Sequence, residues 1–287
     1  MNTKDIKNIK NVSDVQRVIN ANQVIWQGGT PLKDFPIGTK VVDPNTKYYG
    51  QPIVWIIADK NHEGYPANTV TLISEKILCL KALDAAEPSN GNSDRKLYGN
   101  NRYKYSNLLQ WLNSDSNNWY SPQHGADAPP NSSNVNCNPY DSEPGFLNNF
   151  SSDFKTAMVS TRLKTARHDL DGGGSEDVIS KIFLASRAEI GLDNTSEMKF
   201  PIFNNNASRK AYLTAESVSK NKSVNTELAT SKPLQWWLRT PYEFNSFWLY
   251  IVYTDGSSSF SNANSGSYGI RPLCNVKDDS TFFEVIK

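Results

Sequence analysis

The chain has 287 residues, of which 38% are hydrophobic and 21% charged, which is an ordinary composition for a globular protein with one large core or two modest ones. Its formal net charge of +1 and its scattered Lys and Arg residues give no electrostatic reason to expect nucleic acid or an anionic membrane as partner. No apolar run is long enough to span a membrane, and the N-terminal residues lack the apolar centre of a secretory signal. We therefore expect a protein made in a cytoplasm, without export by that route and without membrane insertion.

The three cysteines, Cys79, Cys137 and Cys274, are too few and too far apart for a disulfide framework or a metal-binding knuckle. We interpret them as buried or idle thiols. The sequence thus predicts no metal and no cofactor.

Residues 1–30 form a short segment with a pattern of its own. Apolar residues between Ile6 and Val15 fall mostly at helical spacing, and Val24-Ile25-Trp26 is typical of a short strand before a glycine break. A segment of this size buries little by itself, so it either packs on the main domain, residues 31–287, or docks onto another molecule. The sequence leaves both alternatives open.

The main domain begins with a pattern of strands. The run from 35 to 42 is followed by a predicted turn at Pro44-Asn45 and by a β-branched, aromatic run at 52–58 that predicts a buried strand. Residues 69–80 begin like another strand, and we expect a change to helix near Glu75. Together these runs predict an antiparallel meander of two or three strands.

Two helices are predicted in the middle of the chain. In the first, at 105–112, apolar residues recur at helical spacing after Ser106, a good N-cap residue. The second is expected at 146–158. The residues between them, 113–149, predict a long irregular excursion, which in a compact domain is often functional.

The following segments are shorter. Residues 161–164 are expected to lead back toward the sheet, 182–185 to form a strand and 186–190 a helical turn. Residues 203–232 are rich in Asn, Ser, Lys and Thr, which predicts surface structure with one helix at about 210–219.

The loop Asp169–Asp177 holds four acidic residues around three glycines. Oxygen ligands on a glycine-bent loop suit calcium, but the spacing does not match the twelve-residue calcium loop. We favour a solvated Gly-rich turn, with calcium as the alternative.

The part of the chain after residue 236 differs most from an average composition. Residues 236–268 contain ten aromatic side chains, about a third of all Trp, Tyr and Phe, whereas residues 240–270 carry only two charges, Glu243 and Asp255. Ser, Asn and Gly fill most of the gaps. Rigid aromatic side chains among short polar ones are typical of a recognition surface.

Two apolar signatures, at 236–241 and 269–273, bound this window. Their bulky residues are expected to fill the core beneath the loops, and Arg239 and Arg271 would be poorly solvated there unless they meet carboxylates or backbone carbonyls. We predict that both arginines do so, with binding of an anionic ligand as the alternative. We call these residues the frame: Trp236, Trp237, Arg239, Gly269, Arg271 and Pro272.

Between the signatures the sequence predicts a β-hairpin, with strands at 247–254 and 257–263 around the turn Asp255-Gly256. Both faces of the first strand are apolar, so it is either buried on both sides or exposes hydrophobic groups to a partner. We expect exposure at its ends. The predicted ligand-binding residues lie in the window 242–268: Tyr242, Phe244, Asn245, Phe247, Tyr253, Ser258, Phe260, Asn262, Asn264 and Tyr268. The alternative is an irregular hairpin whose aromatic residues complete the core.

The order of these signals resembles a domain of unknown function common in Gram-positive bacteria and their phages. The resemblance spans about residues 35–277, and its most specific parts are Trp236-Trp237-Leu238-Arg239-Thr240-Pro241 and Gly269-Ile270-Arg271-Pro272. Weaker parts are Gly38-Thr39-Lys40-Val41, Trp55-Ile56-Ile57, the run 71–78, the helix start at 105–108, the run 182–189 and Asp255-Gly256.

The resemblance implies an α+β fold of the C-type-lectin-like class, akin to formylglycine-generating enzymes, with small, mostly antiparallel sheets, two main helices and long irregular loops. Similar domains include the variable proteins of diversity-generating retroelements, whose exposed positions near the end of the chain are diversified, and the window 242–268 looks like that region. Formylglycine-generating enzymes use a pair of active-site cysteines. Cys274 has no sequence neighbour to form such a pair.

We therefore expect no enzyme, since His62, His124 and His168 are isolated and no Ser or Cys occurs in a recognisable nucleophile setting. The expected function is that of a phage or prophage tail-tip or baseplate protein, made in the host cytoplasm, that recognises a bacterial surface polysaccharide, teichoic acid or protein. Residues 1–30 would contact other virion tail proteins, and homo-oligomer formation is left open. The alternatives are a purely structural baseplate subunit and, less favoured, a cell-wall-active enzyme.

Overall fold

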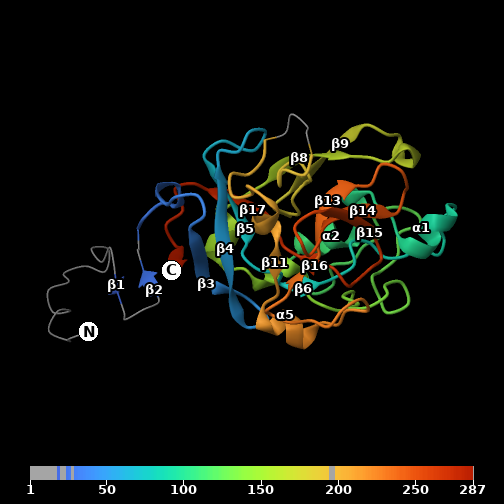
Figure 1. Ribbon diagram of the computed structural model, residues 1–287, viewed down its shortest axis with the longest axis horizontal. Helices are drawn as coiled ribbons and strands as arrows, with labels where there is room; N and C mark the ends of the chain where they lie inside the picture. Colours follow the sequence, from blue (N-terminus) through green and yellow to red (C-terminus); the bar gives the residue numbers. More distant parts are fainter. Residues whose placement is uncertain (1–17, 20–23, 27–28, 194–197, 287) are drawn as a thin grey trace.

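The fold is α+β, with mostly strands and a few short helices (Figure 1). The computed structural model describes residues 18–19, 24–26, 29–193 and 198–286. The α-helices are α1 Ser93–Tyr98, α2 Asn107–Leu112, α3 Ser152–Ala157, α4 Asn206–Arg209 and α5 Ala215–Lys220. Short 3-10 helices are η3 Leu32–Asp34, η4 Tyr103–Tyr105, η5 Phe146–Asn149 and η6 Asp169–Asp171.

The largest sheet has nine strands within the described residues, and every pair in it is antiparallel. Its order is β1-β2-β18-β3-β4-β5-β17-β10, and β7 also pairs with β17. The predicted meander is its centre, β3–β4–β5. The strands are β1 Val18–Ile19, β2 Val24–Trp26, β3 Lys40–Tyr48, β4 Gln51–Lys60, β5 Thr69–Ser74, β7 Met158–Val159, β10 Ile182–Phe183, β17 Leu273–Lys277 and β18 Glu284–Ile286.

A second sheet of five strands has the order β15-β14-β13-β16-β6. The predicted hairpin is present in it as β14 and β15, paired from Trp248–Asn262 to Val252–Ser258. Two further sheets of two strands each are β8-β9 and β11-β12. The strands are β6 Cys79–Leu80, β8 Thr161–Ala166, β9 Ser175–Ser180, β11 Ala211–Tyr212, β12 Pro233–Leu234, β13 Trp236–Pro241, β14 Trp248–Val252, β15 Ser258–Asn262 and β16 Gly269–Ile270.

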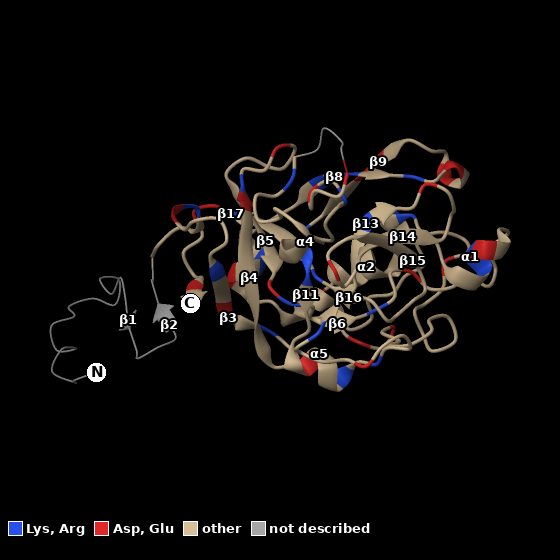
Figure 2. Ribbon diagram, viewed as in Figure 1, with Lys and Arg blue, Asp and Glu red and all other residues tan. Residues whose placement is uncertain are grey.

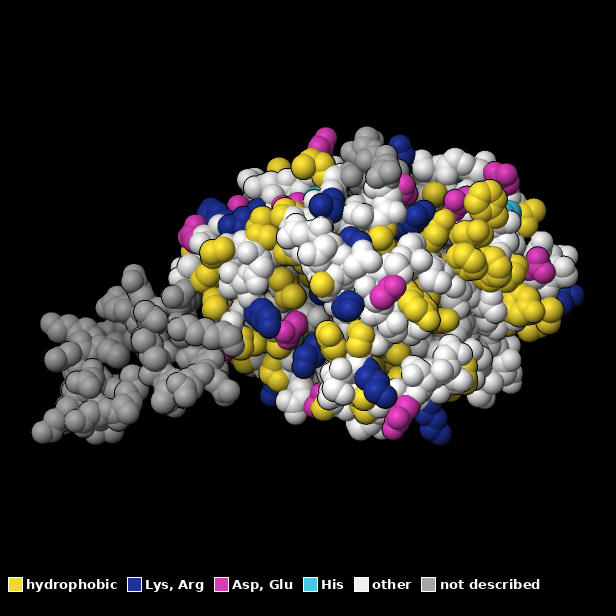
Figure 3. Space-filling view, in the orientation of Figure 1, with side chains coloured by type: hydrophobic (Ala, Val, Ile, Leu, Met, Phe, Trp, Pro, Cys, Tyr) yellow, Lys and Arg dark blue, Asp and Glu magenta, His cyan; other side chains and the backbone are white. Residues whose placement is uncertain are grey.

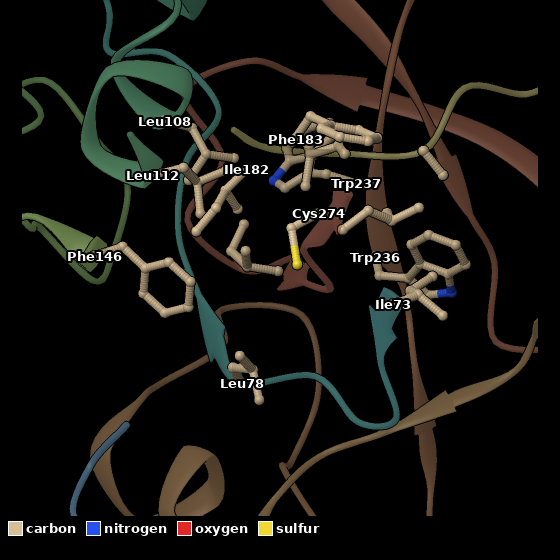
Figure 4. Packing of buried hydrophobic residues seen from close by; sticks show 14 of the residues in the cluster. Ile73, Leu78, Leu108, Leu112, Phe146, Ile182, Phe183, Trp236, Trp237 and Cys274 are labelled. Atoms are coloured by element: carbon tan, nitrogen blue, oxygen red, sulfur yellow. The ribbon is translucent and has the colours of Figure 1, made fainter. Parts of the chain in front are cut away.

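One hydrophobic core connects the two large sheets. Figure 4 shows side chains from β5, α2, β10, β13 and β17 meeting in it, with Trp236 and Trp237 beside Cys274. Both tryptophans are fully buried, and their indole N–H groups donate to backbone carbonyls, Trp236 to Arg209 and Trp237 to Lys81, each at 3.0 Å. Large rings whose polar atom is satisfied are strong core residues. The expected role of the tryptophans in the core is confirmed.

The first predicted helix is confirmed as α2, and its N-cap is Ser106, whose Oγ accepts from the Leu109 N–H. A continuous helix at 146–158 is wrong, because η5 and α3 are separated at Phe150-Ser151. The Ser151 hydroxyl donates to Asp43 at 2.6 Å and accepts from Phe154 N–H, so it caps a new helix instead of continuing the first.

Three other predictions are corrected. The turn predicted at Pro44-Asn45 is wrong, because β3 continues through these residues and the turn lies at Tyr49-Gly50. A register shift between Val42 and Lys47 accommodates the proline, which has no N–H. No helix forms near residue 75, where the Ile77 and Leu78 N–H groups donate to Tyr212 and Ile270 of other segments. The one helix expected at about 210–219 is shorter, α5 at Ala215–Lys220, and β11 precedes it.

Several expectations concern the first 30 residues. The strand at 24–26 is confirmed as β2, and it pairs with β18, so this part of the segment extends the main sheet. The predicted helical spacing between Ile6 and Val15 lies outside the described residues. The docking of this segment onto tail proteins stays a prediction.

A buried ion pair joins the two sheets through the chain after β10. Arg239, on β13, is 1% exposed and donates to both carboxylate oxygens of fully buried Glu189, each at 2.6 Å, and to the Leu184 carbonyl at 2.9 Å. Glu189 also accepts from the Tyr65 hydroxyl and from the Ser186 N–H. The prediction that Arg239 meets a carboxylate and a carbonyl is confirmed.

Arg271, the second predicted clamp, is also buried. Its Nε donates to the Ser74 carbonyl at 2.8 Å, and its guanidinium lies 5.2 Å from the Trp236 ring centre and 5.7 Å from that of Phe203. Burial lowers the pKa of Arg271 to about 10. The carbonyl and the two ring faces therefore offset the desolvation of its guanidinium only in part. The predicted carbonyl contact is confirmed.

We expect Arg239→Met to lower the free energy of unfolding by about 3–5 kcal/mol, because it leaves the Glu189 carboxylate buried without its cation. The double variant Arg239→Met/Glu189→Gln removes that charge and should recover most of the loss. Denaturant unfolding monitored by fluorescence measures both. A double variant no more stable than the single one would contradict this account.

The loss of unfolding free energy in Arg239→Met should also depend on pH. Burial alone would raise the pKa of Glu189, but Arg239 and hydrogen bonds from Tyr65 and Ser186 outweigh it and hold the pKa below its usual range. In the wild type this carboxyl therefore stabilises the fold above its unfolded pKa of about 4.3, and the contribution is lost as the pH falls through the lowered folded-state value.

In Arg239→Met, burial acts without that cation and the Glu189 pKa rises, so protonation stabilises the variant as the pH falls. We expect the stability difference between wild type and variant to narrow from neutral pH to below about pH 4. Denaturant titrations across this range test it, and a constant difference would argue against it.

Candidate functional site

Four aromatic residues of the predicted window form one contiguous cluster, which we call the aromatic platform: Tyr242, Phe244, Trp248 and Phe260. Tyr242 lies at its centre, with ring centres of the other three within 4.5–5.6 Å. Phe260 on β15 stacks on Trp248 of β14 at 4.4 Å. The loop after β13 and the β14–β15 hairpin thus bring their rings to one place.

The platform is open to solvent. Phe244 is 76% and Phe260 39% exposed, while Tyr242 and Trp248 are half-buried. Figure 3 shows hydrophobic side chains gathered on the right of the molecule, over the region where Figure 1 places β14, β15 and α1. Scattered exposed hydrophobic residues are normal, but a contiguous group marks a contact site.

A second layer supports the platform from below. Tyr250 packs against Tyr242 at 5.4 Å, and its hydroxyl donates to Glu243 Oε2 at 2.8 Å. The Arg187 guanidinium carbon lies 3.9 Å from the Tyr250 ring centre, which places a cation over the ring. Burial, followed by the Glu243 hydrogen bond, raises the pKa of Tyr250 to about 12. These contacts fix the ring on which Tyr242 rests.

Asn101 holds the loop that carries Tyr242 and Phe244. It is fully buried, and its amide nitrogen lies 2.8–3.2 Å from three carbonyls of this loop, those of Tyr242, Asn245 and Trp248. Its backbone N–H donates to the Ser246 carbonyl at 3.0 Å. A single amide group from outside the window therefore shares its two N–H donors among three carbonyls of the turn.

Asn245 stabilises the same turn in a different way. Its Oδ1 accepts from the N–H groups of Phe247 and Trp248, at 3.3 and 2.8 Å, as in an Asx turn. Its carbonyl belongs to the group held by Asn101. Asn245 is thus a structural residue of the turn, with its side chain used as an acceptor.

Helix α1 extends the platform on one side. Tyr98 stacks on Phe247 at 4.9 Å, and Phe247 contacts Trp248 at 5.3 Å. Asn264 donates to the Leu97 carbonyl at 3.0 Å, which ties the end of the hairpin to α1. Asn262 accepts from the Trp248 indole at 2.6 Å and orients that ring.

Three of the predicted ligand-binding residues lie elsewhere. Tyr253 is 44% exposed at the opposite end of β14, and Ser258 is paired with Val252 at that same end. Tyr268 is half-buried and packs against Trp237 of the core at 4.9 Å. The structure thus brings together Tyr242, Phe244, Asn245, Phe247, Phe260, Asn262 and Asn264, and separates the other three.

The structure shows which parts of β14 are buried and which are exposed. Leu249, Ile251 and Val252 are buried, and Tyr250 is nearly so, which means that the middle of the strand is covered on both sides. Solvent reaches only its ends, at Trp248 and Tyr253. Exposure at the strand ends is confirmed.

The frame residues lie beneath the window and are buried. Gly269 is required by close packing, because a Cβ there would lie 2.7–2.8 Å from side-chain atoms of Ile77. Pro272 accepts through its carbonyl from the Ser74 N–H, which joins the second signature to β5.

The acidic loop Asp169–Asp177 uses three of its four acids in ion pairs. Asp171 pairs with Arg95, Glu176 with Arg102 and Asp177 with Arg162. Within the residues that the structure describes, no group of three or more His, Cys, Asp or Glu side chains is arranged to hold a metal ion. The loop is the tip of the β8–β9 hairpin, tied to α1 and η4.

Two of the three cysteines, Cys79 and Cys274, are buried. All three cysteines are free, and burial raises the pKa of Cys79 to about 11 and that of Cys274 further. A buried thiol with a raised pKa is a poor nucleophile. Figure 2 shows acidic and basic residues interspersed along the described ribbon.

Sequence reasoning missed several residues of the site. Trp248 and Tyr250 are not among the predicted ligand-binding residues, although they are aromatic residues of the charge-poor window. The sequence does not indicate that Tyr98 and Asn101 belong to the site. The window residues that they contact come 141 to 149 positions later in the chain, and only the fold brings them together.

We expect Asn101→Asp to release the turn, because a carboxylate would face three carbonyls where an amide N–H group now donates. Each unsatisfied buried group costs about 1–3 kcal/mol. Hydrogen exchange of residues 242–248 should therefore rise. The matched control is Asn245→Asp, where the carboxylate accepts as the amide does and exchange should stay unchanged; equal effects of the two changes would refute the assignment.

Comparisons with known proteins identify the chain at the level of its family. A family model described as a domain of unknown function, DUF6273, matches residues 67–278, which include the platform and the frame. No curated protein and no solved structure matches the chain. Within the described residues, no helix is both long and apolar enough to cross a membrane. Because the family model covers most of its length, the chain belongs to the DUF6273 family.

Proposed function

We propose that this protein is a binding module of the C-type-lectin-like class that recognises a bacterial surface ligand, as a phage or prophage tail-tip or baseplate component. The observation that carries the proposal is the aromatic platform. Its rings are partly exposed, contiguous and held by buried polar contacts. Rigid aromatic groups lose little conformational entropy on binding, which favours recognition.

The composition around the platform also supports binding rather than catalysis. Glu243 lies between Tyr242 and Phe244 in the chain, and its carboxylate accepts from the Tyr250 hydroxyl. Arg187 is engaged by the Tyr250 ring and by the Leu192 carbonyl. With its charges occupied in this way, the platform offers ring faces and amides, which suit a polysaccharide or a protein surface.

The C-type-lectin-like assignment is supported by the arrangement of the two signatures. The first is β13, and the second runs through β16 toward β17, with the β14–β15 hairpin between them at the surface. The resemblance implies exposed positions near the end of the chain, and β15 supplies partly exposed residues there. The α+β composition and the irregular stretch at 113–145 agree with it.

We expect the double variant Phe244→Ser/Phe260→Ser to lose binding to intact Gram-positive cells, because both side chains are exposed members of the platform. Removal of buried contact rings typically costs about 1–2 kcal/mol each at an interface, so affinity should fall at least about tenfold. Thermal stability should change little. Fluorescently labelled protein, sedimented with a panel of such cells, measures the binding.

Tyr253→Ser is the matched control, since Tyr253 is an aromatic residue of the same window that lies outside the platform and is 44% exposed, close to the 39% of Phe260. Equal cell binding by wild type and the double variant would refute the platform as the receptor site. A wild type that binds no cells, combined with a loss of self-association in the double variant, would instead favour the structural subunit. Polysaccharide-stripped or protease-treated cells distinguish the two ligand classes.

A further inference from the structure

Strand β15, Ser258–Asn262, forms one edge of the five-stranded sheet, and within the described residues only β14 pairs with it (Figure 1). An edge strand presents unpaired N–H and C=O groups that can pair with another chain. The ring of Phe260, in the middle of β15, belongs to the aromatic platform. The open edge and the platform therefore lie side by side.

The hydrogen bonds of the hairpin show which backbone groups of β15 face outward. At the turn, the Tyr253 N–H donates to the Ser257 carbonyl at 2.8 Å. At the other end, the Ala263 N–H donates to the Phe247 carbonyl at 2.9 Å, and the register between the two ends is continuous. Because alternate pairs of an antiparallel ladder direct their N–H and C=O groups away from each other, the outward residues of β15 are Ser258, Phe260 and Asn262.

These outward groups are mostly open. No described residue hydrogen-bonds to the N–H or C=O of Ser258 or Phe260, or to the N–H of Asn262. The Asn262 carbonyl accepts from the Ser265 N–H at 3.0 Å. Donors and acceptors that recur at every second residue match the main chain of another strand. A saccharide can stack on the rings of the platform, but its hydroxyl groups do not repeat in this way.

Strand β15 also lacks the features that usually protect an edge. It contains no Lys and no Pro, and its pairing with β14 has no bulge. Residues 256–268 include no charged side chain at all. A charged segment would lose its hydration here without meeting an opposite charge, so the edge suits an uncharged one.

The chain itself closes the edge just beyond β15. The Asn264 N–H donates to the Tyr98 carbonyl at 2.9 Å, and the Asn264 carbonyl accepts from the Asn136 N–H at 3.3 Å. A second copy paired antiparallel about Phe260 would bring its own hairpin turn against these two segments. A short free segment fits better, because it can turn away from the edge before Asn264.

We propose that β15 binds an extended, uncharged segment of a cell-surface protein by strand addition. The residue of that segment opposite Phe260 directs its side chain to the same face of the sheet, where an apolar group would contact Phe260 and the neighbouring Trp248 ring. The inference rests on the proposed function, since it makes the edge and the platform one receptor site and names the ligand as protein rather than polysaccharide.

The test uses the full chain, fluorescently labelled, and the panel of Gram-positive cells, either untreated or stripped of surface proteins with protease and washed. Wild-type binding should fall at least about tenfold on the stripped cells. Ser258→Pro should bind untreated cells at least about tenfold more weakly, because it removes an outward donor and its ring hinders strand pairing. Its thermal midpoint should stay near that of the wild type, since no bond to β14 is lost.

Ser258→Ala, which keeps the N–H at the same position, is the matched control and should bind as the wild type does. Equal binding by the proline and alanine variants, or wild-type binding that survives protease, would overturn the proposal. If the proline variant unfolds, the protease comparison decides alone. Should Phe244→Ser/Phe260→Ser lose binding alongside either of these results, only strand addition is rejected; if that double variant binds like the wild type, the proposed function fails as well.

Discussion

The buried pair Arg239–Glu189 is the constraint on which the arrangement of the two large sheets depends. Arg239 belongs to β13 of the smaller sheet, and Glu189 follows β10, an edge of the larger sheet. A guanidinium and a carboxylate removed from water have few acceptable geometries, so the pair specifies how these segments meet. The same strand leads directly into Tyr242, which means that the position of the platform is set by a contact in the core.

The platform itself illustrates how a surface of hydrophobic rings depends on buried polar groups. Stacking alone tolerates several ring arrangements, whereas the Asn101 amide and the Asn245 Asx turn admit one course of the backbone. Arg187 and Glu243 then fix Tyr250 beneath it. Pre-organisation of this kind lowers the entropy lost on binding.

Local signals predicted local structure well, and they failed where distant residues compete. The Ser106 cap, the strand at 52–58 and the Asp255-Gly256 hairpin follow from neighbouring residues alone, and each is present. The helix expected at 146–158 is interrupted because Asp43, a hundred residues earlier, engages Ser151. The same holds for the site. The composition of the window predicts where the site lies in the chain. Only the fold shows that Tyr253 lies at the far end of β14 and that Tyr268 packs on the core, whereas Phe244 belongs to the platform.

The order of the strands also bears on how the chain folds during synthesis. β17 lies between β5 and β10, and β18 between β2 and β3, so strands from late in the described chain occupy interior positions of the main sheet. The early strands cannot complete their hydrogen bonding until residues near 286 have left the ribosome, and pairings of such long sequence separation form slowly. Until then β3 and β5 each present an open edge to other chains, so chaperone dependence during synthesis is the expected cost of this topology.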